Sequence, residues 1–510
     1  MITNLNRKQM DFLVGEVRLH RFIFLAAIII YAITAFYSTG YYHADEHYQI
    51  IEFAGAKSGD NTVDEQAWEF KAMSRQTIQP AIAYVIFSIL KVLNVTDPYY
   101  KALVLRLLTA ALALIVIHLF VRTSLSSVDP KFRFLYLFMS YFLWFVPAVN
   151  VRFSSETWSG LMFLLAVTIL NMKQLQTRHR YFVFGLVAGL GFLFRFQSVF
   201  LFLGLIAWLV FVQRISFRND IQIIAGGLLV QFAGILIDTW FYGSFVVTFW
   251  EYFNKQIIED IASEFGTEVW YYYLKEMIIA PYWPFGVVIV ISFLVLLIKS
   301  ARNYLVWSIL PFLILHSVIP HKEVRFLLPL VNLVPLIIVL GLQSIRYEII
   351  FQRSRRLAKV FIYLILVMFF ILNIIGLAAF SLKPAGNGKM EISRYIAEEF
   401  NEKPVRLIHC SWSSPYNPFE SVPTKFYQRS NVEDIRIVSL CQLNDSLLSN
   451  SKVNLLVLRQ IELKSQRCQI ILQNYKTVEL KRSIPVWIEN LNTFYGEMNT
   501  DDVLILFLIQ

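Results

Sequence analysis

YLVWSILPFLILHSVIPHKEVRFLLPLVNLVPLIIVLGLQ, residues 304–343, consists of two apolar runs on either side of the charged hexapeptide 321–326. The runs at 304–319 and 326–343 approach the roughly 20 residues that a helix needs to cross a bilayer. Comparable apolar runs recur along the chain, at 22–37, 102–121, 133–149, 157–172, 181–194, 196–213, 221–242, 281–299 and 360–380. These runs predict an α-helical polytopic membrane protein with about 11 transmembrane helices.

The composition of the 510-residue chain agrees with this class. Hydrophobic residues make up 57% and charged residues 16%, whereas soluble proteins average about 25% charged residues. A soluble chain of this length has no interior large enough for 44 Phe and 11 Trp residues. The net charge of +10 does not indicate nucleic-acid binding, because cytoplasmic Lys and Arg explain it in a membrane protein. The cysteines, Cys410, Cys441 and Cys468, have no metal-binding spacing.

The positions of Lys and Arg predict the orientation of the chain, because cytoplasmic loops are enriched in positive charge. The short apolar run 81–93 is ambiguous. If it lies along or partly within the membrane, every inside segment is basic; these segments include Arg18, Arg122, Arg180, Arg214, Lys299 and Lys359. If it crosses fully, the pattern is lost. We therefore predict that 81–93 does not fully cross, and that five polar segments share the extracytoplasmic side: 43–46, 152–156, the region around Arg195, 243–280 and 321–326.

The composition changes after residue 380. A breaker-rich linker at 383–388 precedes a predicted amphipathic helix at 389–402. Short β-like runs follow at 405–409, 435–440, 453–458 and 503–509. We predict a multi-spanning membrane domain over 1–380, with a first extracytoplasmic loop at about 41–80, and a small extracytoplasmic α/β domain over 381–510.

Two adjacent acids follow the first predicted helix. Asp45 or Glu46 could accept a proton from a sugar hydroxyl as that hydroxyl attacks. The alternative is that both acids only end a helix at the membrane interface. His43 and His47 lie nearby, but their spacing fits no standard metal motif, so we predict no metal site.

The hexapeptide 321–326 supplies three cationic side chains, those of His321, Lys322 and Arg325. Such a cluster suits a phosphate, with Lys as a point charge and Arg as a bidentate fork. Glu323 could hold one cation in place. The alternative is an ordinary basic loop, which would be expected on the cytoplasmic side instead.

Three more residues have both a structural and a functional interpretation. Arg152 and Glu156 either form an ion pair within a helix, at i,i+4 spacing, or contribute to a site. Arg195, between two apolar runs, either extends toward the interface or contacts a lipid phosphate.

The region 238–273 adds a possible brace and an aromatic surface. Asp238 is expected to brace the loop that follows it. Trp270 and Tyr272 either anchor that loop at the membrane interface or contact substrate.

The hexapeptide 321–326 resembles the signature His-Lys-Glu-x-Arg-Phe of glycosyltransferase family 22, the polyprenol-phosphate-mannose-dependent mannosyltransferases of the GT-C superfamily. Four other segments agree in order. Residues 43–46 resemble His-Pro-Asp-Glu with Ala44 in place of Pro, and 152–156 resemble a shortened Arg-x-x-Ser-x-x-x-Glu. Residues 238–243 resemble Asp-x-x-Phe-Tyr-Gly with Trp240 before Phe-Tyr, and 266–273 resemble Gly-x-x-Pro-Trp-x-x-Tyr with Val269 in place of Pro. Residues 409–416 partly resemble the Cys-His-Ser-Thr-Pro segment of the GPI third-mannose transferase branch, interrupted by Trp412.

The resemblance implies an inverting transfer of mannose from polyprenyl (dolichyl) phosphate mannose to a lipid-linked glycan acceptor, forming an α-mannosidic bond. Asp45 would be the general base and Glu46 would position it or the acceptor. His321, Lys322 and Arg325 would hold the donor phosphate, the leaving group. The resemblance implies no cofactor. The alternatives are a GT-C transferase that uses another polyprenyl-phosphate sugar, an inactive relative that serves as an interaction subunit, and a transporter of lipids or glycolipids.

Overall fold

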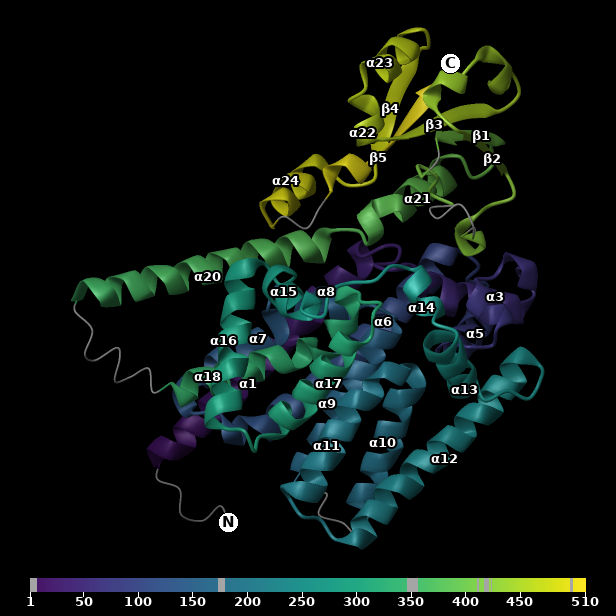
Figure 1. The fold of residues 1–510 in the computed structure, drawn as a ribbon. Helices are drawn as coiled ribbons and strands as arrows, with labels where there is room; N and C mark the ends of the chain where they lie inside the picture. The colour runs from purple at the N-terminus through teal and green to yellow at the C-terminus, as the bar shows by residue number, and fades with distance from the viewer. Residues whose placement is uncertain are drawn as a thin grey trace. The chain divides into compact units, whose positions relative to one another are not determined.

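The computed structural model describes residues 7–172, 179–345, 356–410, 412–416, 422, 424–495 and 499–510. It is mostly helical up to residue 382 (Figure 1). The helices of this part are α1 (Arg7–Tyr37), α2 (Ala44–His47), α3 (Phe53–Ser58), α4 (Trp68–Lys71), α5 (Ile78–Val92), α6 (Pro98–Ser124), α7 (Arg133–Phe142), α8 (Val146–Asn150), α9 (Ser155–Asn171), α10 (Arg180–Phe194), α11 (Val199–Phe211), α12 (Phe217–Tyr242), α13 (Thr248–Phe253), α14 (Ile261–Glu264), α15 (Tyr272–Ile279), α16 (Trp283–Lys299), α17 (Tyr304–Val318), α18 (Val334–Ser344) and α20 (Arg356–Leu382). A π-helical segment, η1 (Tyr48–Glu52), follows α2, and a 3-10 helix, η8 (Val324–Leu333), precedes α18.

Five helical segments among the described residues are long and apolar enough to cross a membrane: Arg18–Tyr37, Pro98–Ser127, Phe217–Tyr242, Val324–Ser344 and Lys359–Leu382. Helices α16 and α17 reach that length only as a pair, which is bent by 117°. Each predicted apolar run contains a helix, but the run 133–149 is divided into α7 and α8. The run 81–93 forms α5, an apolar helix of only 15 residues.

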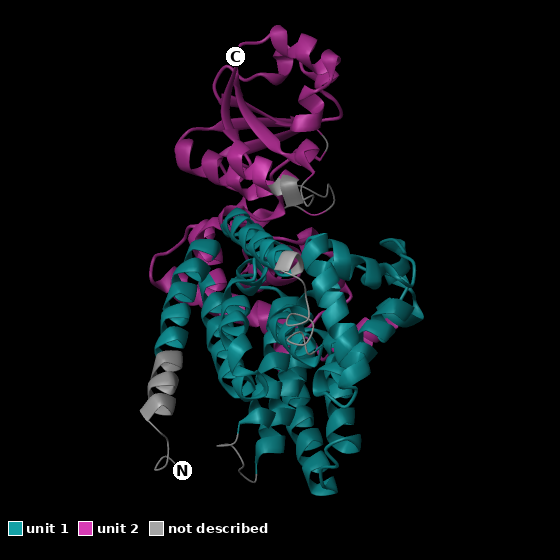
Figure 2. Ribbon diagram, turned by 90° about the vertical axis from the view of Figure 1, so that its left-hand side faces the viewer, with its two compact units in different colours: residues 1–34, 107–236, 255–381 teal, residues 35–106, 237–254, 382–510 magenta. Residues whose placement is uncertain are grey.

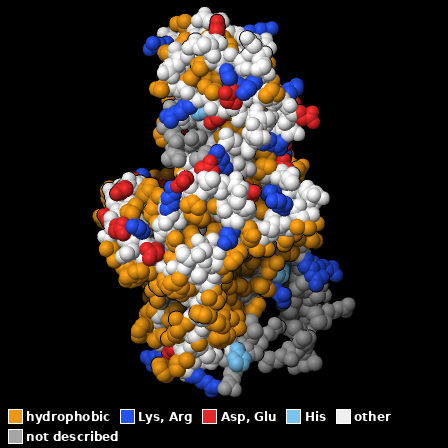
Figure 3. All heavy atoms as spheres, turned by 90° about the vertical axis from the view of Figure 1, so that its right-hand side faces the viewer, with side chains coloured by type: hydrophobic (Ala, Val, Ile, Leu, Met, Phe, Trp, Pro, Cys, Tyr) orange, Lys and Arg blue, Asp and Glu red, His pale blue; other side chains and the backbone are white. Residues whose placement is uncertain are grey.

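The helical surface is rich in apolar side chains. Hydrophobic side chains cover much of the helical part that faces the viewer in Figure 3. Many side chains of α12 and α20 are exposed and apolar, including Leu228, Phe232, Leu364 and Phe370. A hydrocarbon environment would cover such side chains at no free-energy cost, as a membrane protein requires.

The chain divides into two compact units (Figure 2). Unit 1 consists of Met1–Thr34, Leu107–Leu236 and Lys255–Ser381. Unit 2 consists of Ala35–Arg106, Ile237–Asn254 and Leu382–Gln510. Unit 2 therefore combines the segment of about 41–80, here called the first outer loop after its predicted position, with the C-terminal part of the chain.

A close contact between α9 and η8 organises part of unit 1. Gly160 of α9 faces Pro329 of η8, and a Cβ atom at Gly160 would lie 2.8 Å from the Pro329 Cα atom. Only glycine permits this approach without a shift of the backbone. The contact brings Glu156, on the first turn of α9, beside Arg325 of η8.

The C-terminal part of unit 2 contains a five-stranded mixed sheet in the order β2-β1-β3-β5-β4. The strands are β1 (Val405–Cys410), β2 (Val432–Ile437), β3 (Val453–Arg459), β4 (Thr477–Arg482) and β5 (Leu504–Ile509). Strand β1 runs parallel to β2 and β3, whereas β5 runs antiparallel to β3 and β4. The predicted small α/β domain is confirmed, although β4 was not expected.

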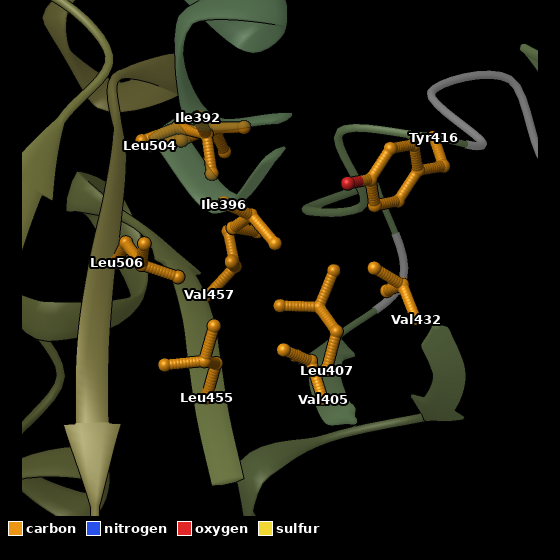
Figure 4. Packing of buried hydrophobic residues seen from close by; sticks show 10 residues of the cluster. All are labelled: Ile392, Ile396, Val405, Leu407, Tyr416, Val432, Leu455, Val457, Leu504 and Leu506. Carbon is orange, nitrogen blue, oxygen red and sulfur yellow. The ribbon is translucent and has the colours of Figure 1, made fainter. Parts of the chain in front are cut away.

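Helix α21 (Lys389–Glu399), which was predicted at 389–402, covers one face of this sheet (Figure 4). Ile392 and Ile396 pack in a buried cluster with Leu407, Val457 and Leu506. The opposite face buries Ile408, Leu456 and Leu458 beneath α23 (Gln466–Gln473). Helices α22 (Gln460–Leu463) and α24 (Val486–Tyr495) complete the domain.

Candidate active site

The predicted site residues fall into both units. Unit 2 contains His43, Asp45, Glu46 and Asp238. Unit 1 contains Arg152, Glu156, Arg195, Trp270, Tyr272, His321, Lys322 and Arg325.

The two adjacent acids of α2 have different surroundings. Glu46 is buried, and its Oε2 atom accepts a hydrogen bond of 2.8 Å from the backbone N–H of Tyr42. The Asp45 side chain keeps 24% of its surface exposed. The Nδ1 atom of His43 accepts a hydrogen bond from the backbone N–H of Asp45, at 3.3 Å, and so caps α2. Asp45 is thus the more accessible carboxylate of the pair.

Arg75 lies between Asp45 and a second acid, Glu69. Its Nη2 atom is 3.8 Å from Asp45 Oδ2 and 3.6 Å from Glu69 Oε1. The guanidinium also lies 5.3 Å from the ring centroid of Tyr252, a cation–π distance. Gln49 donates a hydrogen bond of 2.9 Å to Glu69 Oε1. Burial raises the pKa of Glu69, and the Arg75 charge opposes that rise.

Neither Arg75 nor Glu69 was predicted from the sequence as a site residue. Both lie in the first outer loop, among polar residues that no motif distinguishes. A basic residue on a predicted extracytoplasmic loop is the one signal that could have drawn attention to Arg75.

Asp238 accepts hydrogen bonds from the first outer loop and also from the loop that follows Asp238 in sequence. Its Oδ1 atom accepts hydrogen bonds from the Thr77 backbone N–H at 2.8 Å and the Thr77 hydroxyl at 2.6 Å. Its Oδ2 atom accepts a hydrogen bond of 2.6 Å from the Thr248 hydroxyl. Tyr242, four residues after Asp238, donates a hydrogen bond of 2.7 Å to the backbone carbonyl of Arg75. The segment 238–243 therefore fixes the position of the backbone at residues 75–77, which include Arg75.

In unit 1, two arginines share one buried carboxylate. Glu156 Oε1 lies 2.7 Å from Arg195 Nη1 and 3.3 Å from Arg325 Nη1. The Nε and Nη2 atoms of Arg325 each donate a hydrogen bond of 2.8 Å to Glu323, in a bidentate arrangement. Arg152 lies in the coil before α9, so Arg152 and Glu156 do not belong to one helix, as their i,i+4 spacing had suggested.

The other two cations of the hexapeptide contact the segment 266–268. His321 lies 3.0 Å from Glu323 Oε1 through Nε2 and 2.9 Å from the Gly266 carbonyl oxygen through Nδ1. Lys322 donates a hydrogen bond of 2.9 Å to the backbone carbonyl of Glu268. The hydrogen bond to Glu323 raises the pKa of His321 above its ordinary value, against the effect of burial. Burial lowers the pKa of Lys322.

The aromatic residues after Glu268 differ in exposure. Trp270 is exposed, whereas Tyr272 is partly buried at the start of α15. Burial raises the pKa of Tyr272 to about 12, so its hydroxyl stays protonated and can donate a hydrogen bond.

The cation cluster, defined as Arg195, His321, Lys322 and Arg325, is chemically suited to an anion. Its charges are held in place by carboxylates and carbonyls, so they are preorganised. A phosphate that binds here would compete with Glu156 and Glu323 for the same guanidinium N–H groups. Among the residues that the structure describes, no group of three or more His, Cys, Asp or Glu gathers as a metal site.

The segment 409–416 lies in the C-terminal domain. His409 of β1 is buried, and its Nε2 atom lies 3.1 Å from Asp434 Oδ1. Burial acts to lower the pKa of His409, but its interaction with Asp434 raises it overall. Ser411 lies outside the described residues.

Residues 22–417 match the model of the Alg9-like mannosyltransferase family. The chain belongs to this family, which confirms the predicted family. Mannosyltransferase APTG1 of Arabidopsis thaliana is 24% identical over 330 residues, which cover 62% of this chain and 57% of that protein. GPI alpha-1,2-mannosyltransferase 3 of Danio rerio is 21% identical over 277 residues, which cover 52% of this chain and 49% of that protein. The chain thus spans about half the length of these curated relatives.

A solved structure shares the fold. ArnT from Cupriavidus metallidurans, in the apo state, matches with a TM-score of 0.50 at 12% identity, over 97% of this chain and 98% of that chain. The likeness confirms the predicted GT-C fold class and, with the apolar helices, a multi-pass membrane protein.

Proposed function

We propose that this protein is an inverting mannosyltransferase that moves mannose from polyprenyl (dolichyl) phosphate mannose to a lipid-linked glycan acceptor. Asp45 carries the proposal: of the acids at the start of the first outer loop, it keeps an accessible carboxylate, while the adjacent Glu46 is buried and hydrogen-bonded. A transferase that uses a sugar hydroxyl as nucleophile needs a base of this kind.

In the proposed reaction, the acceptor hydroxyl oxygen attacks C1 of the mannose, and Asp45 accepts the hydroxyl proton. The bond between C1 and the phosphate oxygen breaks, and polyprenyl phosphate leaves with the electron pair. Attack from the face opposite to the phosphate turns a β-linked donor into an α-linked product. A phosphate is a good leaving group, so no general acid is required.

The cation cluster is assigned to the donor phosphate. His321, Lys322 and Arg325 stabilise the negative charge that grows on the leaving group. Arg195 belongs to the same cluster, since it shares the Glu156 carboxylate with Arg325. Trp270 and Tyr272 remain candidates for contact with the glycan or with membrane lipid.

Glu46 and His43 are assigned positioning roles. Glu46 holds the Tyr42 backbone and His43 caps α2, so both act on the turn that presents Asp45. The site is assigned to the extracytoplasmic side of the membrane, which is the ER lumen in a eukaryote and the periplasmic side in a bacterium, because the basic residues mark the other loops as cytoplasmic.

Purified protein supplied with radiolabelled dolichyl phosphate mannose and a GPI-precursor glycolipid acceptor tests the proposal. The native protein should transfer mannose, and Asp45→Asn should abolish transfer while binding the donor. Asp501→Asn, on the surface of the C-terminal domain, is the matched control and should keep native activity. Transfer by Asp45→Asn at the native rate would reject Asp45 as the base.

The same assay separates the alternatives. Release of label from a glucose- or arabinose-phosphate lipid, with none from the mannose lipid, would indicate a transferase for another sugar. Movement of intact glycolipid across proteoliposomes without chemical transfer would indicate a transporter.

A further inference from the structure

The first outer loop and the C-terminal domain meet inside unit 2 through a buried acid, Glu52. This residue is 2% exposed. Its Oε1 atom lies 2.7 Å from His47 Nε2 and accepts a hydrogen bond of 3.1 Å from the backbone N–H of Phe426. Its Oε2 atom accepts a hydrogen bond of 2.7 Å from Asn61. A buried carboxylate needs several donors, and one of these donors comes from a residue 374 positions further along the chain.

Residues 425–429, here called the clasp segment, make further contacts with the same region. The Phe426 ring stacks on Phe87 of α5 at 5.2 Å, and the Tyr427 ring stacks on His47 at 5.4 Å. Lys425 pairs with Glu65 at 3.2 Å, and Arg429 pairs with Asp97 at 3.2 Å. Apolar, hydrogen-bonding and ionic contacts therefore hold the clasp segment along its whole length.

His47 transmits this anchoring to α2. It is the last residue of α2 and is fully buried between the rings of Tyr41 and Tyr427. Residues two apart on a helix point to different sides. Fixing His47 on the buried side therefore fixes the rotation of α2 and keeps Asp45 on the accessible side.

We propose that the clasp segment, through Glu52 and His47, is a positioning element for Asp45, so that the C-terminal domain takes part in sugar transfer. The inference rests on the proposed function, in which Asp45 is the base. A misplacement of the reacting groups by about 1 Å can lower the rate about 100-fold. The proposed role of the clasp segment is to place Asp45, and the donor phosphate is assigned to the cation cluster, so donor binding should not depend on the clasp segment.

Steady-state kinetics of the full-length protein in nanodiscs test this. Glu52→Ala should lower kcat about 10- to 100-fold and leave the donor KM within about twofold. Both Phe426→Ala and Phe426→Leu keep the backbone N–H group that Glu52 accepts. Phe426→Ala, which loses the ring, should lower kcat about 10-fold, and Phe426→Leu, which keeps most of the bulk, should stay within about threefold of native. Arg406→Ala breaks an ion pair to Glu433 in the sheet without touching the clasp segment, and should keep native kinetics.

A native kcat in Phe426→Ala would overturn the proposal, as would a fall in kcat that Arg406→Ala reproduces. A second measurement needs no activity. In the Asp45→Cys variant, a maleimide modifies the cysteine side chain at position 45, and mass spectrometry of the peptide that contains this position follows the rate. This rate should change when Glu52→Ala is added to the same protein. An unchanged rate would also overturn it. If the native protein fails to transfer mannose but this rate changes, the proposed function fails and the positioning role stands.

Discussion

Arg75 gives Asp45 its immediate electrostatic setting, because its guanidinium lies between Asp45 and Glu69. Removing the guanidinium would take away the positive charge that lies between these two carboxylates. Arg75→Ala should therefore lower kcat about 10-fold or more, and Arg75→Lys, which keeps the charge but not the fork, should recover part of it. Rate measurements with saturating donor and acceptor check this, and equal activity of all three proteins would contradict it.

Donor binding should depend on pH through His321. Glu323 raises the pKa of His321, so the imidazole stays protonated to a higher pH and adds a positive charge to the cation cluster. Donor affinity should therefore be highest below that raised pKa and fall as the pH rises through it. In the Glu323→Gln variant, the fall in donor affinity should begin at a lower pH, because the carboxylate that raises the pKa of His321 is gone.

Donor KM measured between about pH 5 and 9 follows this transition. His321→Asn, which does not titrate, is the control and should remove the transition. A KM profile in Glu323→Gln that coincides with the native one would show that Glu323 does not set the charge of His321.

Individual site residues were predictable to different degrees. The motif residues could be chosen because charged side chains between apolar runs are costly unless they serve a site. Arg75 could not, because its link to Asp45 exists only after the first outer loop folds. Glu52 and His47 could not either, since their partner Phe426 is remote in sequence.

At the scale of elements, the contact between α9 and η8 controls the distance between Glu156 and Arg325. Gly160→Ala would place a methyl group 2.8 Å from Pro329 Cα, so the two elements must separate. We expect a lower thermal unfolding temperature and a weaker donor affinity. Gly227→Ala, whose added Cβ would lie no closer than 3.9 Å to the carbonyl oxygen of Gly185, is the matched control. Equal donor affinity in both variants would contradict the role of this contact.

Helices and strands differed in how well the sequence predicted them. Long apolar runs predicted the helices, since hydrophobic length is a local property. Strand β4 was missed because its sequence, TVELKR, is largely polar and it lies at the edge of the sheet. The division of 133–149 into α7 and α8 was missed because apolar composition does not reveal where a helix breaks.

At the scale of the whole molecule, the native cysteines offer a test of orientation. All three lie between residues 410 and 468, and Cys441 is exposed. If the C-terminal domain is extracytoplasmic, a membrane-impermeant maleimide should label Cys441 in intact bacterial cells that express the protein, once their outer membrane is permeabilised. Cys441→Ser should lose most of the label. Labelling only after the inner membrane is opened would reverse the predicted topology.

Unit 2 is assembled from three separate stretches of chain, and this has a consequence for the order in which the protein is made. A ribosome completes the segment around Asp45 long before it reaches Phe426, 374 residues beyond Glu52. During that interval Glu52 lacks one of its hydrogen-bond donors, and the ring of Tyr427 is not yet present to cover His47. The first outer loop can therefore complete its packing only after the clasp segment has been synthesised. In chains released earlier, Glu52 lacks the Phe426 N–H donor and His47 lacks the Tyr427 ring.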